Sequence, residues 1–245
     1  MPDGQKPARL ILALDAAGDS CSAAIGRVGN DRAGNDRAGG DELVVLAQEK
    51  LVMKHGHAAQ LVPMLERVAD LADIALADLD LIAAGIGPGG FTGLRIALAT
   101  ARGLGLALDC PVIGISNFRA AAETVPADIR ANLTGDILVL IDSRRDEPYL
   151  ARLDTALRYR AAPRFMSLPE IAADIAAAPP ALVTGDGTGL WPHPFAPGTV
   201  LHPAAGDALS ILRLAADGEA RYAEKPLPLY IREADVSKPK PAAGA

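Results

Sequence analysis

The chain has 245 residues, a length that fits one or two domains. Half of the residues are hydrophobic but only 4% are aromatic, so the core must consist mainly of Ala, Leu, Ile and Val. Such a core suits helices layered on a sheet, and it excludes a wholly disordered chain. The formal net charge of −6 disfavours a protein that holds nucleic acid by itself, because that task needs many basic residues.

Cysteine usage and hydropathy predict a cytoplasmic protein. Cys21 and Cys110 have no metal-like or Cys-x-x-Cys spacing, so we expect reduced, buried thiols. No apolar run approaches the roughly 18–20 residues that would cross a bilayer. The first residues carry no apolar leader pattern, so no membrane association is expected.

The first part of the chain predicts a hairpin followed by alternating helices and strands. Apolar runs at 9–14 and 21–27 flank a turn that begins at Asp15. The pentapeptide Gly-Asn-Asp-Arg-Ala then occurs twice in a row, and we expect the polar segment 29–40 to be a flexible insertion at the hairpin tip. Strands are predicted at 43–46, 81–86 and 112–115, helices at 57–73 and 92–108, and a helix capped by Ser116 towards Thr124.

The same pattern begins again in the second half. Strands at 137–141 and 149–153 flank a turn that begins at Asp142, so the chain is predicted to be internally duplicated. A capping box at Ser167 and Glu170 opens a helix, and a strand at 181–184 runs into a glycine-rich turn. The last helix is predicted at 207–216. The predicted division is a disordered start 1–8, a first domain 9–125, a second domain 126–236 and a disordered tail 237–245.

The glycine-rich loop after residue 84 raises the question of nucleotide binding. Gly85, Gly87 and Gly90 fit the G-x-G-x-x-G pattern between a strand and a helix, but the next strand ends without the carboxylate that binds a ribose. We therefore do not expect a dinucleotide site. Asp15 and Asp142 are the best acidic candidates, although an aspartate in such a turn also forms Asx hydrogen bonds.

Two further features have both a structural and a functional explanation. His55 and His57 flank one glycine, but no carboxylate or cysteine stands nearby to complete a metal site, so a surface or capping role is favoured. The helix at 92–108 carries a small residue at every fourth position. These small side chains let another backbone approach closely, whether the protein's own sheet or a helix of a partner.

Five segments together resemble the bacterial TsaB (YeaZ) family. They are Leu12-Ala-Leu-Asp15, His57-Ala-Ala-Gln-Leu-Val-Pro63, Gly85-Ile-Gly-Pro-Gly-Gly-Phe-Thr-Gly-Leu-Arg95, Ile141-Asp-Ser-Arg144 and Pro228-Leu-Tyr-Ile-Arg232. The resemblance covers the chain from about 9 to 233. It implies an α/β fold of the duplicated actin-like ATPase type (ASKHA, ribonuclease H-like), with two domains of which the second is reduced. It also implies a role in making N6-threonylcarbamoyladenosine (t6A) in transfer RNA.

The resemblance further implies a non-catalytic subunit with no cofactor of its own. Its expected partners are a TsaD-like catalytic paralogue, which it activates, and a TsaE-like ATPase; ATP and a metal ion belong to those partners. Alone it is expected to form a homodimer, and tRNA is reached only through the complex. The metal-binding histidines of the paralogue correspond to Asn117 and Ala121, so no metal site is expected here. An active ATPase or phosphotransferase that uses Asp15 stays open as the alternative.

The resemblance also assigns candidate residues, and none of them is catalytic. The expected partner surface lies on the helices at 57–72 and 92–108, and its residues are His57, Leu61, Met64, Leu65, Val68, Thr92, Gly93, Arg95, Ile96, Ala97, Thr100, Ala101 and Gly105. A weaker nucleotide-binding set comprises Asp15, Gly89, Gly90, Asp142, Gly185 and Gly187. Asp142-Ser-Arg-Arg-Asp146 replaces the family's Asp-x-Gly-Gly-Thr pattern, which weakens the second phosphate corner.

Overall fold

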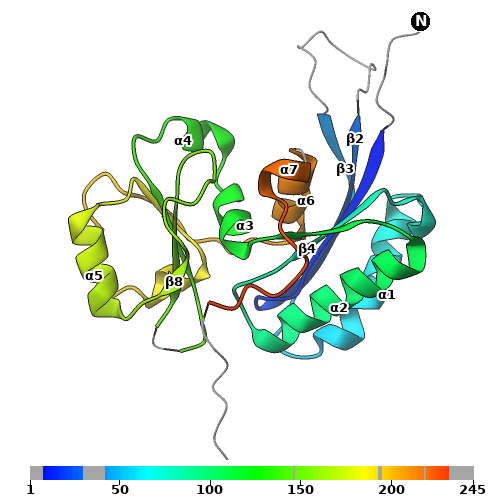
Figure 1. Ribbon diagram of the computed structural model, residues 1–245, viewed down its shortest axis with the longest axis horizontal. Coiled ribbons are helices and arrows are strands. Elements are labelled where there is room, and N and C mark those ends of the chain that lie inside the picture. The colour runs from blue at the N-terminus through cyan, green and yellow to red at the C-terminus, as the bar shows by residue number, and fades with distance from the viewer. Residues whose placement is uncertain (1–7, 30–41, 146, 193–194, 218, 232–245) are drawn as a thin grey trace, which may run out of the picture.

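The protein has two lobes that lie side by side (Figure 1). A computed structural model describes residues 8–29, 42–145, 147–192, 195–217 and 219–231. Each lobe is built on a five-stranded sheet, with helices packed against it. The expectations for the first residues, for the repeated pentapeptide and for the tail concern 1–7, 30–40 and 237–245, which lie outside the described residues.

The first sheet combines a hairpin with a parallel pair. Its order is β3-β2-β1-β4-β5, and the strands are β1 (Arg9–Asp15), β2 (Ser20–Gly29), β3 (Glu42–Val52), β4 (Leu81–Gly85) and β5 (Val112–Ile115). β2 is antiparallel to β1 and β3, whereas β1, β4 and β5 are parallel. β1 is apolar at nearly every position because both faces of this sheet are covered.

The second sheet repeats this topology. Its order is β8-β7-β6-β9-β10, and the strands are β6 (Ile137–Ile141), β7 (Tyr149–Leu153), β8 (Arg164–Phe165), β9 (Leu182–Thr184) and β10 (Val200–His202). The first three are antiparallel, and β6, β9 and β10 are parallel. The predicted duplication and fold class are therefore confirmed, and the strands of the second lobe are the shorter ones.

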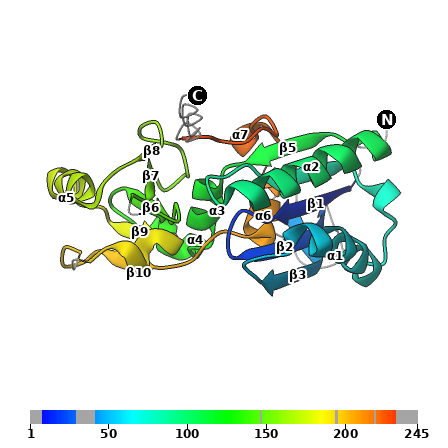
Figure 2. The ribbon, with the colours of Figure 1, turned by 90° about the horizontal axis from the view of Figure 1, so that it is seen from below.

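The helices cover the sheets unequally. α1 (His57–Leu71) and α2 (Phe91–Leu108) pack on the face of the first sheet that points away from the second lobe (Figure 2). α3 (Asn117–Glu123) and α6 (Ala208–Ala216) lie between the sheets, and α5 (Leu168–Ala177) packs on the outer face of the second sheet. The short elements are η1 (Leu76–Asp78), α4 (Ala127–Ala131), η2 (Asp186–Leu190) and α7 (Glu219–Tyr222).

One apolar cluster joins the two lobes. It contains Ile11 and Ala13 of β1, Phe118 of α3, and Ile137 and Val139 of β6, all of them fully buried. The alternate residues of β1, by contrast, face α1 and α2 in a second cluster. The lobes therefore share a core, because the two sheets present their inner faces to the same helices.

The predicted domain boundary needs a correction. β6 to β10 do follow residue 126, but α6 packs against β1, β2 and β4 of the first sheet. Further along, the backbone N–H of Leu229 donates to the carbonyl of Ile86 (2.8 Å). The C-terminal part of the predicted second domain 126–236 thus returns to the first lobe, since α6 supplies the apolar cover that this face of the first sheet requires.

The local signals in the sequence mostly agree with the observed elements. Ser116 caps α3 by accepting a hydrogen bond from the N–H of Phe118 (3.3 Å), and Asp207 caps α6 by accepting one from Ser210 (3.2 Å). By length and composition, α2 is the one helix in the described part that could cross a membrane. A third of its apolar window is buried in the fold, and core helices often meet the same criteria.

Candidate functional site

A small cleft opens between the lobes at the carboxyl ends of β1 and β6. The equivalent strand ends bring Asp15 and Asp142 to its two sides, as the duplicated hairpins predict. Its volume is about 20 Å³. The lining residues are Asp15, Ala17, Gly18, Pro88, Gly89, Asn117, Ala121, Ile141, Asp142, Asp186, Ala205 and Gly206.

Asp15 is a buried carboxylate that the first lobe holds in place. Its side chain accepts hydrogen bonds from Asn117 Nδ2 at Oδ1 (3.1 Å) and from the N–H of Ala17 at Oδ2 (3.2 Å). The Asn117 carboxamide oxygen in turn accepts from the N–H of Gly87 (2.9 Å). Burial raises the pKa of Asp15 to about 6, although both hydrogen bonds work in the opposite direction. The carboxyl group is therefore poised to change its charge near neutral pH.

The glycine-rich loop of the first lobe is shaped to fit the turn after Asp15. The N–H of Gly90 donates to the carbonyl of Ala17 (2.6 Å). A Cβ on Gly93 would lie 1.8 Å from the carbonyl oxygen of Ala16, and one on Gly89 would lie 2.5 Å from that of Ala17. The glycines at 89 and 93 thus serve a backbone-to-backbone contact, because any side chain there would push the loop away from the turn.

The corner of the second lobe is closed by charged side chains. The N–H of Asp142 donates to Asp186 Oδ1 (3.0 Å), and burial raises the pKa of Asp186. Both terminal nitrogens of the Arg144 guanidinium contact the carboxylate of Asp19, in the first-lobe turn, at 2.7 and 2.9 Å. An arginine from one lobe therefore bridges the cleft to an aspartate of the other.

The candidate nucleotide residues have different surroundings. Asp15, Gly89 and Asp142 line the cleft, and Gly90 contacts the turn beside it. Gly185 and Gly187 instead pack on β6: a Cβ at these positions would lie 1.9 Å from the carbonyl oxygen of Leu140 and 2.9 Å from the carbonyl carbon of Ile141. These two glycines serve the packing of η2 on β6, and their assignment to a nucleotide stays a prediction. Asp186, between them, does reach the cleft, and the Gly-Asp-Gly motif is the signal for it.

The positions that match the paralogue's metal histidines do not form a ligand set. Asn117 uses its carboxamide to join Asp15 to Gly87, and Ala121 is buried in the shared core and has no ligand atom on its side chain. No group of three or more His, Cys, Asp or Glu side chains within the described ranges could hold a metal ion. The residues present therefore do not fit the metal of the paralogue.

The expected partner surface needs the largest correction. Eight of its residues are buried within this protein's own first lobe, where they pack on the sheet: Leu61, Met64, Leu65, Val68, Gly93, Ala97, Ala101 and Gly105. A Cβ on Gly105 would lie 2.3 Å from a methyl group of Val112 in β5. The small-residue stripe thus serves close packing of α2 on its own sheet and offers no surface to a partner.

The outward faces of the same helices remain open. Thr92 and Arg95 are exposed, whereas His57, Ile96 and Thr100 are partly buried. Large apolar side chains also lie on this surface: Leu106 is 85% exposed, Leu71 is 71% exposed, and Val62 and Phe91 are half exposed. The outer surfaces of α1 and α2 thus expose several large apolar side chains.

Comparisons with known proteins agree with the resemblance. The family model described as "TsaD: tRNA N6-adenosine threonylcarbamoyltransferase" matches residues 45–176, more than half of the chain. The TsaB protein of Escherichia coli, named as a tRNA threonylcarbamoyladenosine biosynthesis protein, is 29% identical over 235 residues, which is 91% of this chain and 94% of that protein.

Other relatives extend this result. An uncharacterized protein of Mycobacterium tuberculosis is 38% identical over 150 residues, which is 60% of this chain, and the match spans 61% of the length of that relative. The crystal structure of a YeaZ-like protein of Pseudomonas aeruginosa superimposes with a TM-score of 0.71 at 27% identity and covers 91% of this chain and 100% of that one. A second structure, YeaZ of the same organism, gives a TM-score of 0.69 at 26% identity, with 91% and 99% covered. On these matches the chain belongs to the TsaB (YeaZ) family, a branch of the proteins that the TsaD model describes.

Proposed function

We propose that this protein is a non-catalytic subunit in the biosynthesis of N6-threonylcarbamoyladenosine in tRNA. In this role it binds and activates a TsaD-like catalytic paralogue in the cytoplasm, together with a TsaE-like ATPase. ATP, the metal ion and the main contacts to tRNA belong to the partners. The names of its relatives and the match to the TsaD family model support the pathway.

The Arg144–Asp19 bridge is the observation that best supports a non-catalytic role. A working phosphate site keeps a backbone corner that can approach a polyanion. Here Asp142 is followed by two arginines, and Arg144 directs its guanidinium to the opposite lobe. The walls of the cleft carry the carboxyl groups of Asp15, Asp142 and Asp186. Such walls disfavour a bound triphosphate.

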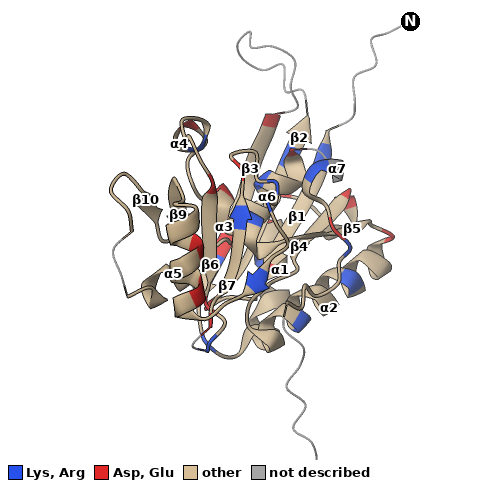
Figure 3. Cartoon of the chain, turned by 60° about the vertical axis from the view of Figure 1, so that its left-hand side comes forward, with Lys and Arg blue, Asp and Glu red and all other residues tan. Residues whose placement is uncertain are grey.

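The outward faces of α1 and α2 are the surface that we propose for pairing. α1 exposes Glu66, Asp70 and Arg67, of which Arg67 pairs with Glu49 of β3. α2 exposes Arg95 and Arg102 and contains no acidic residue, and Figure 3 shows basic segments on this helix. A partner with two equivalent helices, packed across a two-fold axis, would place acidic against basic side chains. This complementarity supports both a complex with the paralogue and a homodimer in its absence.

Reconstitution tests the function directly. The catalytic paralogue, the ATPase, tRNA, ATP and threonylcarbamoyl-adenylate as the activated donor are combined with and without this protein, and t6A is measured in the digested tRNA. We expect product formation to fall at least about a hundredfold without this protein. An equal rate without it would contradict the proposal.

A charge placed on the outer face of α2 tests the pairing surface. Leu106→Glu is expected to weaken binding to the paralogue at least about tenfold, because the carboxylate would be buried without a partner. Since Leu106 is exposed, the melting temperature of the free protein should not change. Leu201→Glu, at an exposed position on β10 of the second lobe, is the matched control. Ala97→Glu is unsuitable for this purpose, because Ala97 is buried and the variant would disturb the fold.

Asp15 supports a second candidate function, an ATPase of the same fold. A buried carboxyl group with a pKa of about 6 in an interlobe cleft is the kind of group that an enzyme uses for proton transfer. ATP turnover by the isolated protein that disappears in Asp15→Asn would favour this alternative over the subunit role. We expect no such turnover.

A further inference from the structure

An exposed cluster joins the start of α2 to the C-terminal segment of the chain. It consists of Phe91, Arg95 and Tyr230. The guanidinium carbon of Arg95 lies 3.6 Å from the centroid of the Phe91 ring, and Arg95 Nε donates a hydrogen bond to the Tyr230 hydroxyl (3.0 Å). The two rings stack with their centroids 6.0 Å apart. The guanidinium thus lies over the Phe91 ring and beside the Tyr230 ring, 5.9 Å from its centroid, rather than extending freely into solvent.

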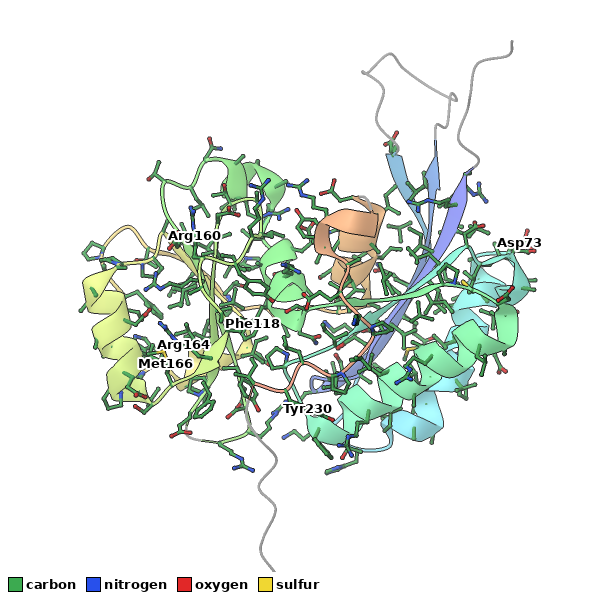
Figure 4. All side chains as sticks on the ribbon, in the orientation of Figure 1. Asp73, Phe118, Arg160, Arg164, Met166 and Tyr230 are labelled. Carbon is green, nitrogen blue, oxygen red and sulfur yellow. The ribbon has the colours of Figure 1, made fainter. Side chains whose placement is uncertain are left out.

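The cluster stays open to solvent although its parts are apolar. Phe91 is 49% exposed and Tyr230 is 52% exposed, and neighbouring Leu227 is 49% exposed. Tyr230 lies where α2 begins, at the end of the helix nearest the second lobe (Figure 4). The chain has only nine Phe, Tyr and Trp residues, and two of them lie half exposed beside the same arginine. Aromatic residues and arginine are also the types that contribute most to binding energy at interfaces.

The charge of Arg95 has no acidic partner in the described part of the chain. Its contacts are the Phe91 ring, the Tyr230 ring and the Tyr230 hydroxyl, and no described carboxylate lies within ion-pair distance. Nε is used on Tyr230, and no described residue accepts a hydrogen bond from the two terminal nitrogens, whose N–H groups lie in one plane. That arrangement matches the two oxygens of a carboxylate.

We infer that this cluster receives an aspartate or glutamate side chain of the catalytic paralogue, flanked by an apolar residue that covers Phe91 and Tyr230. The inference rests on the proposed function, because the paralogue is the partner named there. Charge complementarity determines the choice of ligand: one planar cation within an apolar rim fits one carboxylate within an apolar segment. A strand of RNA fits less well, since the cluster offers a single cation and the chain carries a net charge of −6.

Binding of the purified paralogue to wild-type protein and variants tests the inference. Arg95→Ala should weaken binding at least about tenfold. Arg95→Lys should weaken it nearly as much, because a lysine keeps the charge but not the planar pair of donors. Tyr230→Phe, which removes only the hydroxyl that orients Nε, should have a smaller effect of about two- to threefold. Arg160→Ala is the control, since Arg160 is an exposed arginine on the second lobe that pairs with Asp136.

A charge exchange then identifies the partner group. Arg95→Glu should abolish binding, and replacement of one exposed acidic residue of the paralogue by arginine should restore it. Failure of every such replacement, or unchanged binding of Arg95→Ala and Arg95→Lys, would overturn the inference while leaving the proposed function intact. If the wild-type protein does not bind the paralogue at all, the proposed function fails first and this inference fails with it.

Two other occupants of the cluster give different results. If RNA occupies it, Arg95→Ala will leave the affinity for the paralogue unchanged and weaken the affinity of the assembled complex for tRNA. Glu233 and Asp235 come soon after Tyr230 in the sequence. If they occupy it, Arg95→Ala and the double variant Glu233→Gln with Asp235→Asn will lower the melting temperature of the free protein equally, with no loss of partner binding. Either result would overturn the inference.

Discussion

The two lobes share a topology but differ in the segment that comes after their inner parallel strand. In both lobes a glycine with positive φ lies shortly beyond the strand, Gly87 (91°) after β4 and Gly185 (104°) after β9. The chain then forms the 18-residue helix α2 in the first lobe but only the five-residue η2 in the second. The turn geometry is present in both lobes, whereas a long helix follows it directly in the first lobe only.

The turns that follow β1 and β6 also differ between the two lobes. Asp15 is buried, and its hydrogen-bond partners all belong to the first lobe. Asp142 is more exposed and is followed by Arg144, which also has a positive φ (63°) and reaches across to Asp19. Two equivalent strand ends therefore perform different tasks: one maintains a buried carboxyl group, and the other anchors a bridge between the lobes.

The largest effect is expected where glycine permits a backbone contact. Gly93→Ala should lower the free energy of unfolding by about 3 kcal/mol or more, because its Cβ would lie 1.8 Å from the carbonyl oxygen of Ala16. Gly185→Ala should cost as much, since its Cβ would lie 1.9 Å from the carbonyl oxygen of Leu140 at a positive φ. Urea denaturation measures both changes.

The control lies in the same helix as Gly93. A Cβ on Gly103 would have no atom within 4 Å, so Gly103→Ala should raise the free energy of unfolding by about 0.5–1 kcal/mol through helix propensity. Equal effects at 93 and 103 would show that α2 does not pack on the Asp15 turn in this way.

An effect that depends on pH is expected at Asp15. Burial raises the pKa of Asp15 from 3.8 to about 6 in the folded state, so the ionised carboxylate opposes folding above pH 6. At pH 8, Asp15→Asn should raise the free energy of unfolding by about 3 kcal/mol. This gain should shrink as the pH falls from 6 to 4 and vanish below about pH 4, where the carboxyl group is protonated in both states. A pH-independent difference in urea denaturation would contradict this account.

The smallest effect is expected at the bridge between the lobes. Arg144→Ala should lower the free energy of unfolding by at most about 1 kcal/mol, because Arg144 and Asp19 are both nearly half exposed. The loss should decrease in about 1 M NaCl, since salt screens exposed charges. Asp19→Ala and the double variant complete the cycle, and additive losses would mean that the two side chains do not stabilise each other.

Most elements can be predicted from the sequence because their signals are local. The runs at 137–141, 149–153 and 112–115 form strands with the predicted bounds, and the caps at Ser116 and Asp207 mark the starts of their helices. The pattern predicts β3 only to residue 46, but the strand continues to Val52, because its last residues pair with the start of β2. Such pairing between segments that are distant in the sequence leaves no local pattern.

In the candidate site, too, local features can be predicted from the sequence, whereas contacts between distant residues cannot. The motif after β4 and the two strand-end aspartates point to the cleft, and Asp15, Gly89 and Asp142 do line it. No sequence pattern predicts that Asn117 holds Asp15, because the two residues are 102 positions apart. Nor does any pattern indicate that Arg144 reaches Asp19, 125 positions away.

The family, the duplicated α/β fold and the spacing of small residues along α2 can all be predicted from the sequence, because motifs and periodicity depend on residues that are close together in the chain. Which side of α2 is free becomes clear in the folded molecule alone. The same stripe of Gly93, Ala97, Ala101 and Gly105 could pack against a partner helix or against the protein's own sheet. Gly93 approaches Ala16, just after β1, and Gly105 approaches Val112 of β5, so the stripe packs on the first lobe of this protein. A small side chain allows close approach but does not specify which surface approaches, and that choice arises from how the whole chain packs.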